Sequence, residues 1–205
     1  LYRAVLAMHS SARFVGVTGT NGKSTTTALI QHLLAGAGRP ALVGGNLGPA
    51  ALGLKMLGSD GVYTLEMSSY MLERIATLRF NVAVMLNLSP DHLDRHGDMA
   101  GYAAAKARIF ARQTGDDVAV LGQDDAMTAA LRRGLKARVV PVSGLARRQK
   151  GGIWAEDRLL RDEAGAILDL GAAPNLPGSH NAQNAAAAAA ACFALGLSRD
   201  EVAAG

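Results

Sequence analysis

The stretch Gly16-Val-Thr-Gly19-Thr-Asn-Gly22-Lys23-Ser24-Thr25 decides the fold of this 205-residue chain. It follows Arg13–Thr18 (RFVGVT), which predicts a buried strand, and it leads into Lys23–Ala37, which predicts a helix. Glycines at such a junction let the backbone turn sharply and point successive N–H groups into one concavity. The helix N-terminus adds its partial positive charge, so phosphate oxygens are stabilised there. The sequence therefore predicts a nucleotide phosphate loop between the first strand and the first helix.

Two side chains of this loop have a specific chemistry. Lys23 can reach the outer phosphates of a nucleotide, and the Ser24 hydroxyl can ligate Mg²⁺. The alternative is a glycine-rich turn whose lysine faces solvent, and the order Gly-Lys-Ser between a strand and a helix argues against it. Val17 stands where a nucleotide-binding loop usually has its leading glycine. The residues that we assign to ATP binding here are Gly19, Thr20, Asn21, Gly22, Lys23, Ser24 and Thr25.

Further along the chain, short β-rich runs alternate with helical stretches. Such alternation predicts an α/β fold with a mostly parallel sheet flanked by helices on both faces, of the P-loop type. The strands that we predict are Ala41–Val43, Val62–Glu66, Val82–Asn87, Asp117–Leu121 and Ala137–Val142. The helices that we predict lie near Gly48–Leu57, Ser69–Thr77, Met99–Gln113 and Asp125–Arg133.

The pattern changes in the C-terminal part. Gly151–Leu170 predicts a small antiparallel meander appended to the parallel sheet, because short apolar runs are separated there by polar turn residues. Asn181–Leu195 predicts an alanine-dominated helix, and Glu201–Gly205 shows no closing element. We treat residues 1–205 as one domain. Neither end carries a start or stop signal, so we expect an excised domain.

Composition limits the classes of partner. The formal net charge is +4, but the basic residues are scattered and aromatic residues make up only 4% of the chain. Nucleic-acid surfaces usually combine basic patches with aromatic side chains, so we expect no nucleic-acid partner. An anionic small-molecule substrate explains the basic excess equally well.

Cys192 is the only cysteine, so no internal disulfide can form, and its alanine-rich surroundings predict a buried thiol. No apolar run reaches membrane-spanning length, and the N-terminus lacks the features of a secretory signal. These observations predict a cytoplasmic protein without a membrane partner.

Three further side chains follow the predicted strands, where a parallel sheet forms its ligand crevice. Glu66 ends one strand and could hold Mg²⁺, although it could also be a solvent-facing helix cap. Pro90 and Asp91 predict a turn that presents His92 to the crevice, although a lone histidine is more often structural. Lys106 lies four residues after Tyr102 on the same helix face, which by spacing alone is unremarkable.

The remaining histidines and asparagines carry weaker signals. His9 and His32 are interpreted as ordinary surface residues, and His96 as either a supporting residue behind the site or an exposed one. Asn181 and Asn184 share one face at the start of the alanine-rich helix, where their amides could recognise the N6/N7 edge of adenine. The alternative is an asparagine-rich helix start that satisfies its own backbone donors.

Taken together, these motifs resemble the Mur ligase family over almost the whole chain. Their order and spacing all agree with that family, and Gly-Gly-Asn followed by Glu-x-Ser-Ser-Tyr is most similar to its D-glutamate-adding branch. The matching strings are Gly19–Thr25, Gly44–Gly48, Leu65–Tyr70, Asp91–Gly97, Tyr102–Lys106 and His180–Asn184.

The resemblance implies a reaction in which ATP phosphorylates the carboxylate of UDP-N-acetylmuramoyl-L-alanine and the amine of D-glutamate attacks the acyl phosphate. It also implies two Mg²⁺ ions and the catalytic residues Lys23, Glu66, His92 and Lys106. Lys23 would steady the transferring phosphate, and Ser24 and Glu66 would hold one ion. His92 and Lys106 would hold the second ion, with Lys106 carbamylated so that it becomes an oxygen ligand.

The same resemblance places Asn46 and Ser68 near the muramoyl-alanine substrate. Met71 departs from the pattern, because the D-glutamate-adding enzymes usually have glutamine there. The family also has an N-terminal uridine-binding domain and a C-terminal domain, neither of which matches this chain, so we expect the chain alone to complete no reaction. The alternatives are another Mur ligase, a folylpolyglutamate synthetase, whose loop usually continues Gly-Lys-Gly where this chain has Ser24, and a non-catalytic nucleotide-binding domain.

Overall fold

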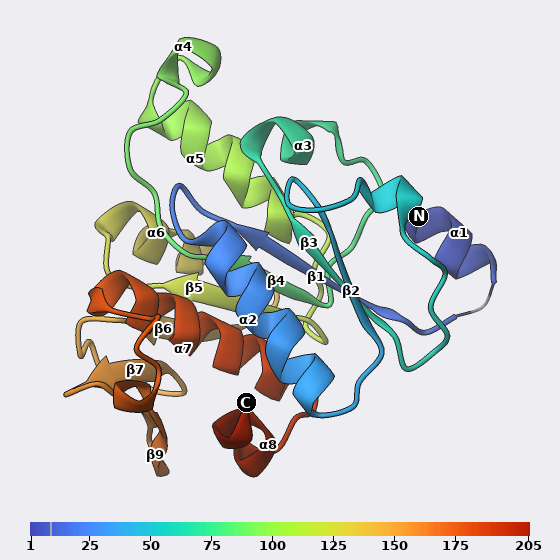
Figure 1. Ribbon diagram of the computed structural model, residues 1–205. Helices are drawn as coiled ribbons and strands as arrows, with labels where there is room; N and C mark the ends of the chain where they lie inside the picture. Colours follow the sequence, from blue (N-terminus) through green and yellow to red (C-terminus); the bar gives the residue numbers. More distant parts are fainter. Residues whose placement is uncertain (9) are drawn as a thin grey trace.

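The computed structural model describes residues 1–8 and 10–205, so His9 lies outside the described part. Its centre is a nine-stranded sheet with the order β2-β3-β1-β4-β5-β6-β7-β8-β9 (Figure 1). The strands are β1 (Arg13–Thr18), β2 (Ala41–Gly45), β3 (Val62–Glu66), β4 (Val82–Met85), β5 (Val118–Gly122), β6 (Arg138–Ser143), β7 (Ile153–Glu156), β8 (Leu159–Asp162) and β9 (Gly165–Asp169).

The strand order places the ends of β1, β3 and β4 together. All pairs from β2 to β7 are parallel, and only β7-β8 and β8-β9 are antiparallel. Glu66, the last residue of β3, stands beside Val17 of β1 and Gly45 of β2. The chain order reverses on either side of β1, and a parallel sheet binds its ligands outside the carboxyl ends of strands at such a point. The predicted fold class is confirmed, including the meander.

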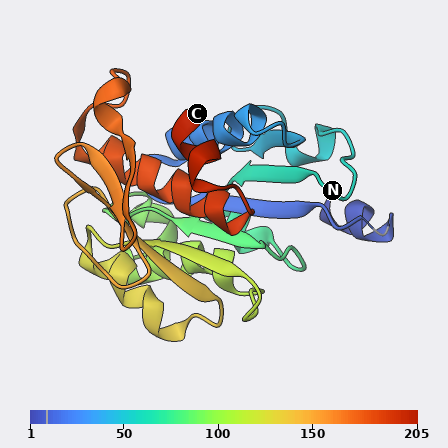
Figure 2. The same ribbon diagram turned by 90° about the horizontal axis from the view of Figure 1, so that it is seen from below.

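Helices cover both faces of the sheet, which Figure 2 shows from below. The helices α2, α7 and α8 pack on one face, and α1, α3 and α5 pack on the other. The α-helices are α1 (Tyr2–Ala7), α2 (Lys23–Gly36), α3 (Ser69–Arg74), α4 (Leu93–His96), α5 (Met99–Ala107), α6 (Ala126–Ala130), α7 (Gly178–Ala194) and α8 (Arg199–Ala204). Short 3₁₀ turns are η1 (Ala51–Gly53), η2 (Arg108–Phe110), η3 (Leu131–Gly134) and η4 (Leu170–Ala172).

The two faces have cores of different composition. On one face the buried alanines 185–191 of α7 pack against valines of the central strands. On the other face the sheet contributes Phe14 and Tyr63, whose rings stack 5.0 Å apart, and Phe80, in the loop before β4, is fully buried. Small side chains let a helix lie close to a sheet, whereas large rings fill a wider space. Cys192 is buried in the alanine-rich core, as predicted.

Several predicted helices are longer than the helices that form. The helix predicted over Gly48–Leu57 is only the 3₁₀ turn η1, because Gly48, Pro49, Gly53 and Gly58 interrupt regular helix formation. The helix that starts at Met99 ends at Ala107 and tightens into η2 before Gln113. The side-chain amide of Gln113 instead donates to the carbonyls of Phe80 and Val118.

The C-terminal stretch also differs from the prediction. Instead of ending without a closing element, the chain forms α8, which begins with a capping box. The Ser198 hydroxyl accepts from the backbone N–H of Glu201 at 3.2 Å, and the Glu201 carboxylate accepts from the backbone N–H of Ser198 at 2.6 Å. The spacing Ser-x-x-Glu was a helix-start signal in the sequence.

Side chains from helices reach both outer strands of the sheet. Arg199 of α8 pairs with Asp162 of β8 at 2.7 Å and donates to the carbonyl of Gly165 at 2.9 Å, at the start of β9. At the opposite edge, Gln31 of α2 donates to the carbonyl of Ala41 in β2 at 3.0 Å. Each edge strand is therefore tied to a covering helix. Among the described helices, none has the length and apolar character needed to cross a membrane.

Candidate functional site

The loop between β1 and α2 has the backbone that the sequence predicted. Gly22 is the N-cap of α2 with φ of 83°, and Gly19 has φ of 153°. A Cβ atom at Gly22 would lie 2.2 Å from the side-chain oxygen of Asn184, which reaches the loop from α7. Only glycine fits there, because both the conformation and the close approach exclude a side chain. The loop is thus held between its own helix and α7.

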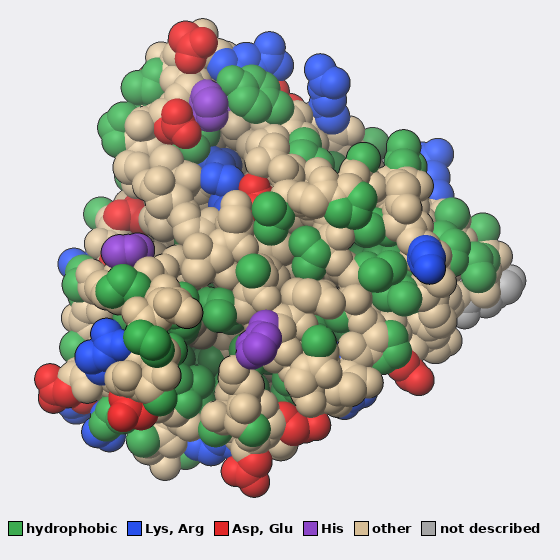
Figure 3. Space-filling view, in the orientation of Figure 1, with side chains coloured by type: hydrophobic (Ala, Val, Ile, Leu, Met, Phe, Trp, Pro, Cys, Tyr) green, Lys and Arg blue, Asp and Glu red, His purple; other side chains and the backbone are tan. Residues whose placement is uncertain are grey.

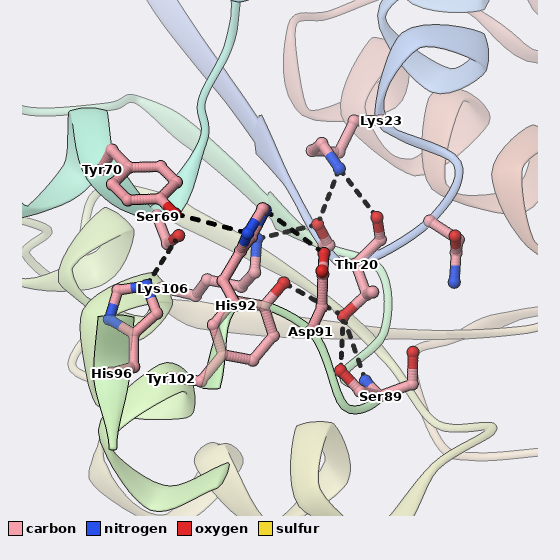
Figure 4. Close-up of polar contacts among 12 residues, drawn as sticks. Thr20, Lys23, Ser69, Tyr70, Ser89, Asp91, His92, His96, Tyr102 and Lys106 are labelled. Carbon is pink, nitrogen blue, oxygen red and sulfur yellow. Dashed lines mark hydrogen bonds and ion pairs between the residues drawn. The ribbon is translucent and has the colours of Figure 1, made fainter. Parts of the chain in front are cut away.

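Lys23 folds back over this loop. Its ammonium donates to the carbonyl of Gly19 at 3.1 Å and to that of Thr20 at 2.8 Å. Hydrogen bonds from an ammonium to neutral carbonyls are weaker than those to a phosphate oxygen, so a phosphate bound at the loop would be the stronger partner for Lys23. Figure 4 shows Lys23 above Thr20, on the side of the loop that faces the other site residues.

Glu66, at the end of β3, contacts Ser24 of the phosphate loop. Its side chain is 2% exposed, and its two oxygens accept from the Ser24 hydroxyl at 2.8 Å and the Asn46 amide at 2.8 Å. A hydroxyl and a carboxylate in contact beside a phosphate loop are the oxygen donors that Mg²⁺ prefers. These residues therefore fit the predicted metal, and Glu66 is not the solvent-facing cap that was the alternative.

His92 lies at the start of α4. Its backbone is left-handed, with φ of 51°, and such a conformation in a non-glycine residue often marks a functional constraint. Its ring nitrogens lie 3.3 Å from the hydroxyl of Tyr70 and 3.4 Å from the carboxylate of Asp91. Both nitrogens thus have partners, so a metal bound by His92 would displace one of them.

Lys106 is buried beneath the loop, with 2% of the residue exposed. Its ammonium donates to the carbonyl of Gly19 at 2.8 Å and lies 4.8 Å from the centre of the Tyr102 ring. Burial, with a smaller contribution from the charge of Lys23, lowers the pKa of Lys106 from 10.5 to about 8. About half of this amine is consequently neutral near pH 8, and about a tenth near pH 7.

Lys23, His92 and Lys106 line one cleft of about 290 Å³ at the carboxyl ends of the strands. In the space-filling view, basic and acidic side chains meet in a hollow below the α3–α5 region (Figure 3). Ser68, which caps α3 by accepting from the backbone N–H of Met71, also reaches the cleft. The lining residues are Lys23, Asn46, Ser68, Ser69, Tyr70, Asp91, His92, Tyr102 and Lys106.

The predicted adenine contacts lie elsewhere. Asn184 is buried against Gly22, and its amide donates to the side chain of Asn181 at 3.3 Å. Asn181 itself donates to the carbonyl of Pro177 at 2.9 Å. The pair therefore links the start of α7 to the phosphate loop, behind the cleft, and its role toward adenine stays a prediction.

Asn87 is a site residue that the sequence reasoning did not assign. Its side chain accepts from the backbone N–H of Asn21 at 2.9 Å and donates to the carbonyl of the same residue at 3.1 Å. Asn87 thereby fixes the tip of the phosphate loop from the end of β4. Its place just after a strand adjacent to β1 was the available signal.

The predicted metal ligands include a serine hydroxyl and a modified lysine rather than a cluster of acidic and histidine side chains. Within the described part of the chain, no group of three or more His, Cys, Asp or Glu side chains has an arrangement that could hold a metal ion. A first ion would use the Ser24 hydroxyl with Glu66. A second ion would require the modification of Lys106, since an ammonium ion repels a cation.

Comparison with known proteins places this arrangement in a family. Residues 17–192 match the family model for the Mur ligase middle domain. A UDP-N-acetylmuramoylalanine–D-glutamate ligase of Phenylobacterium zucineum is 48% identical over 207 aligned residues, which cover 95% of this chain and 43% of that protein. Another of the same name, from Rhodospirillum rubrum, is 50% identical over 90% of this chain and 40% of its own.

A solved structure agrees with these sequence matches. It is that of a UDP-N-acetylmuramoyl-L-alanyl-D-glutamate–2,6-diaminopimelate ligase, with a TM-score of 0.78 and 26% identity, and the match covers 98% of this chain and 47% of that one. The chain thus spans less than half the length of the relatives that it matches. On the family match and the identity to these relatives, this chain belongs to the Mur ligase family, whose middle domain it contains.

Proposed function

We propose that this chain is the ATP-binding part of a ligase that joins D-glutamate to UDP-N-acetylmuramoyl-L-alanine in peptidoglycan synthesis, in the cytoplasm. The observation that carries the proposal is the contact of Ser24 with Glu66 beside the phosphate loop. Asn46, which donates to Glu66, lines the same cleft as Lys23, His92 and Lys106. The choice of D-glutamate is supported by the names of the relatives at 48% and 50% identity.

In this proposal the loop and its neighbours bind and orient ATP. The loop amides and Lys23 hold the phosphates, and the charge of Lys23 stabilises the transferring phosphoryl group by position and electrostatics. Ser24 and Glu66 would hold Mg²⁺, which supplies charge neutralisation on the phosphate oxygens when bound. Asn46 orients Glu66 through its amide and is close enough to the cleft to contact the muramoyl-alanine substrate as well.

The proposal includes carbamylation of Lys106. The neutral amine would attack CO₂, a nitrogen–carbon bond would form, and the amine would lose a proton, leaving an anionic carbamate. The burial that lowers the pKa of Lys106 to about 8 makes the neutral amine available for this step. Lys106 with His92 would then hold a second Mg²⁺, whose charge would balance the carbamate inside a buried site.

Calorimetric titration of the chain with the non-hydrolysable ATP analogue AMPPNP and Mg²⁺ tests the loop assignment. Lys23→Ala should weaken binding about tenfold or more, because a charged contact to phosphate is lost. Lys136→Ala is the matched control, since it removes an exposed lysine that lies outside the cleft lining. Equal affinity of the wild type and Lys23→Ala would show that nucleotide binds elsewhere.

The amino-acid substrate is tested on the full-length protein that contains this chain. Phosphate release from ATP is measured with UDP-N-acetylmuramoyl-L-alanine and either D-glutamate, L-glutamate or D-alanine. We expect release with D-glutamate only. Release with another amino acid and none with D-glutamate would contradict the proposed substrate.

A further inference from the structure

His96 is buried behind the wall of the cleft although it belongs to the short helix α4. Its side chain is 2% exposed, and its Nε2 lies 3.0 Å from the hydroxyl oxygen of Ser69. Its Nδ1 lies 3.4 Å from Oε1 of Glu73. A carboxylate can only accept, so in the neutral ring Nδ1 carries the hydrogen and Nε2 accepts from the Ser69 hydroxyl. The neighbours of His96 therefore select one tautomer and one direction for the hydrogen of Ser69.

Glu73 is itself held in place for this contact. Its second carboxylate oxygen accepts from the guanidinium of Arg95 at 2.9 Å, and this hydrogen bond holds the pKa of Glu73 below its usual value. Arg95 and His96 are consecutive residues of α4, whereas Glu73 and Ser69 lie one turn apart on α3. The two short helices are thus joined at two adjacent points, of which only the Ser69 hydroxyl belongs to a residue that lines the cleft.

The ring of His96 also supports the aromatic part of the cleft wall. It lies 5.8 Å from the ring of Tyr70 and 5.4 Å from that of Tyr102. The ring of His92, four residues earlier in the chain, lies 5.2 Å from the Tyr70 ring, and its Nδ1 lies 3.3 Å from the Tyr70 hydroxyl. Figure 4 shows Tyr70, His92, His96 and Tyr102 grouped together, with Ser69 above His96.

We propose that His96 is a positioning residue of the ligase reaction, which fixes the Ser69 hydroxyl and the Tyr70–His92 pair on the cleft wall. This inference rests on the proposed function. With its hydrogen directed to His96, Ser69 presents only lone pairs to the cleft. It therefore accepts a hydrogen bond from an N–H or O–H donor of the bound acceptor substrate or of an ordered water, and it does not donate one.

The first test is the tautomer of His96, which needs no catalytic activity. Long-range ¹H–¹⁵N spectra of the chain at pH 8, above the usual histidine pKa, distinguish the two neutral tautomers. The chain has five histidines, so the signal that disappears in His96→Gln assigns His96. We expect the hydrogen on Nδ1 in the wild type. We expect a shift toward the other tautomer in Glu73→Leu. A wild-type spectrum with the hydrogen on Nε2 would overturn the inference.

The second test separates positioning from folding in the full-length protein. His96→Phe keeps a ring between the two tyrosines but removes both nitrogens, and it should lower kcat about 10–100-fold. The KM for ATP should stay within about threefold of the wild type, because the phosphate loop does not contact His96. His96→Gln, which can still accept from Ser69, should recover part of the loss. His32→Phe, a change of an exposed histidine, is the matched control.

The outcomes distinguish this inference from the proposed function. If His96→Phe folds and keeps the wild-type kcat, the positioning role is wrong. If His96→Phe does not fold, Ser69→Ala replaces it and should show the same loss of kcat, and a wild-type kcat would again refute the role. A wild type that releases no phosphate with D-glutamate contradicts the proposed function, and the tautomer measurement then still decides the geometry.

Discussion

The two faces of the sheet pack their helices with opposite kinds of side chain. On the face of α2 and α7, the alanine run 185–191 lets α7 approach the strands closely enough for Asn184 to touch Gly22. On the face of α3 and α5, rings such as Phe80 and Tyr102 fill the space, and the Tyr102 ring also lies beside the buried Lys106. The alanine face therefore holds the phosphate loop in place, whereas the aromatic face contributes Tyr70, Tyr102 and Lys106 to the lining of the cleft.

The largest effect on stability is expected from removing a large ring from the aromatic face. Phe80 is fully buried, and a Cβ atom added to Gly16 would lie 2.8 Å from its ring, so the ring fills its site completely. Phe80→Ala should lower the free energy of unfolding by about 3–5 kcal/mol, measured by urea denaturation. Leu52→Ala, at a residue that is 86% exposed, should change it by less than about 0.5 kcal/mol. Equal effects of the two variants would show that this face is loosely packed.

The next largest effect on stability is expected at Lys106, the buried cation on the aromatic face. Because the pKa of Lys106 falls from 10.5 in the unfolded chain to about 8 in the folded one, the unfolded chain binds more protons between these values. The resulting penalty is fully present below pH 8 and is lost as the pH rises toward 10.5. Lys106→Met should therefore raise the unfolding free energy by up to about 3 kcal/mol at pH 7.

This gain should shrink as the pH approaches 10.5, since the wild type loses its penalty and the variant has none. Thermal or urea unfolding in CO₂-free buffer at pH 7 and pH 10 measures the difference between the two proteins. A difference that is the same at both values would mean that the pKa of Lys106 is not lowered.

Overfilling the alanine face should have a smaller effect. Ala187 is fully buried on α7, and Ala187→Leu adds volume where the helix and sheet are already in contact. We expect a loss of about 1–3 kcal/mol in the unfolding free energy. Ala100→Leu, on the exposed side of α5, is the matched control and should be nearly neutral. A neutral Ala187→Leu would indicate space between α7 and the sheet.

The smallest effect is expected at the edge of the alanine face, where α8 begins. Ser198→Ala removes the hydroxyl that accepts from Glu201, and it should cost about 0.5–2 kcal/mol in urea denaturation. Ser59→Ala, at an exposed loop position, controls for loss of a serine hydroxyl. If both variants unfold alike, the capping box contributes nothing to stability.

Local signals predicted much of this fold. The strand Arg13–Thr18 and the start of α2 at Lys23 agree with the structure residue by residue, because a buried β-rich run and a glycine turn act over short distances. The capping box of α8 was equally local and could have been recognised. The 3₁₀ turn at Ala51–Gly53 could not be sized from pattern alone, since apolar residues at helical spacing surround its glycines.

The sequence predicted site residues that lie at the ends of strands, but not the contacts that they make. Glu66 follows from its place at the end of β3, but its contact with Asn46 depends on the pairing of β2 with β3, which sets Gly45 beside Glu66. The burial of His96 depends on how α4 folds onto α3, and no spacing in the sequence encodes that angle. Contacts between elements far apart in the chain therefore needed the structure.

The side chains that tie the outer strands to their helices have a consequence for behaviour at high protein concentration. An edge strand with free carbonyls can pair with a strand of another molecule and begin aggregation. In this sheet Gln31 already occupies a carbonyl of β2, and Arg199 occupies carbonyls at the start of β9. At these points the carbonyls of both edge strands are not free to pair with another molecule, because side chains of α2 and α8 already donate to them.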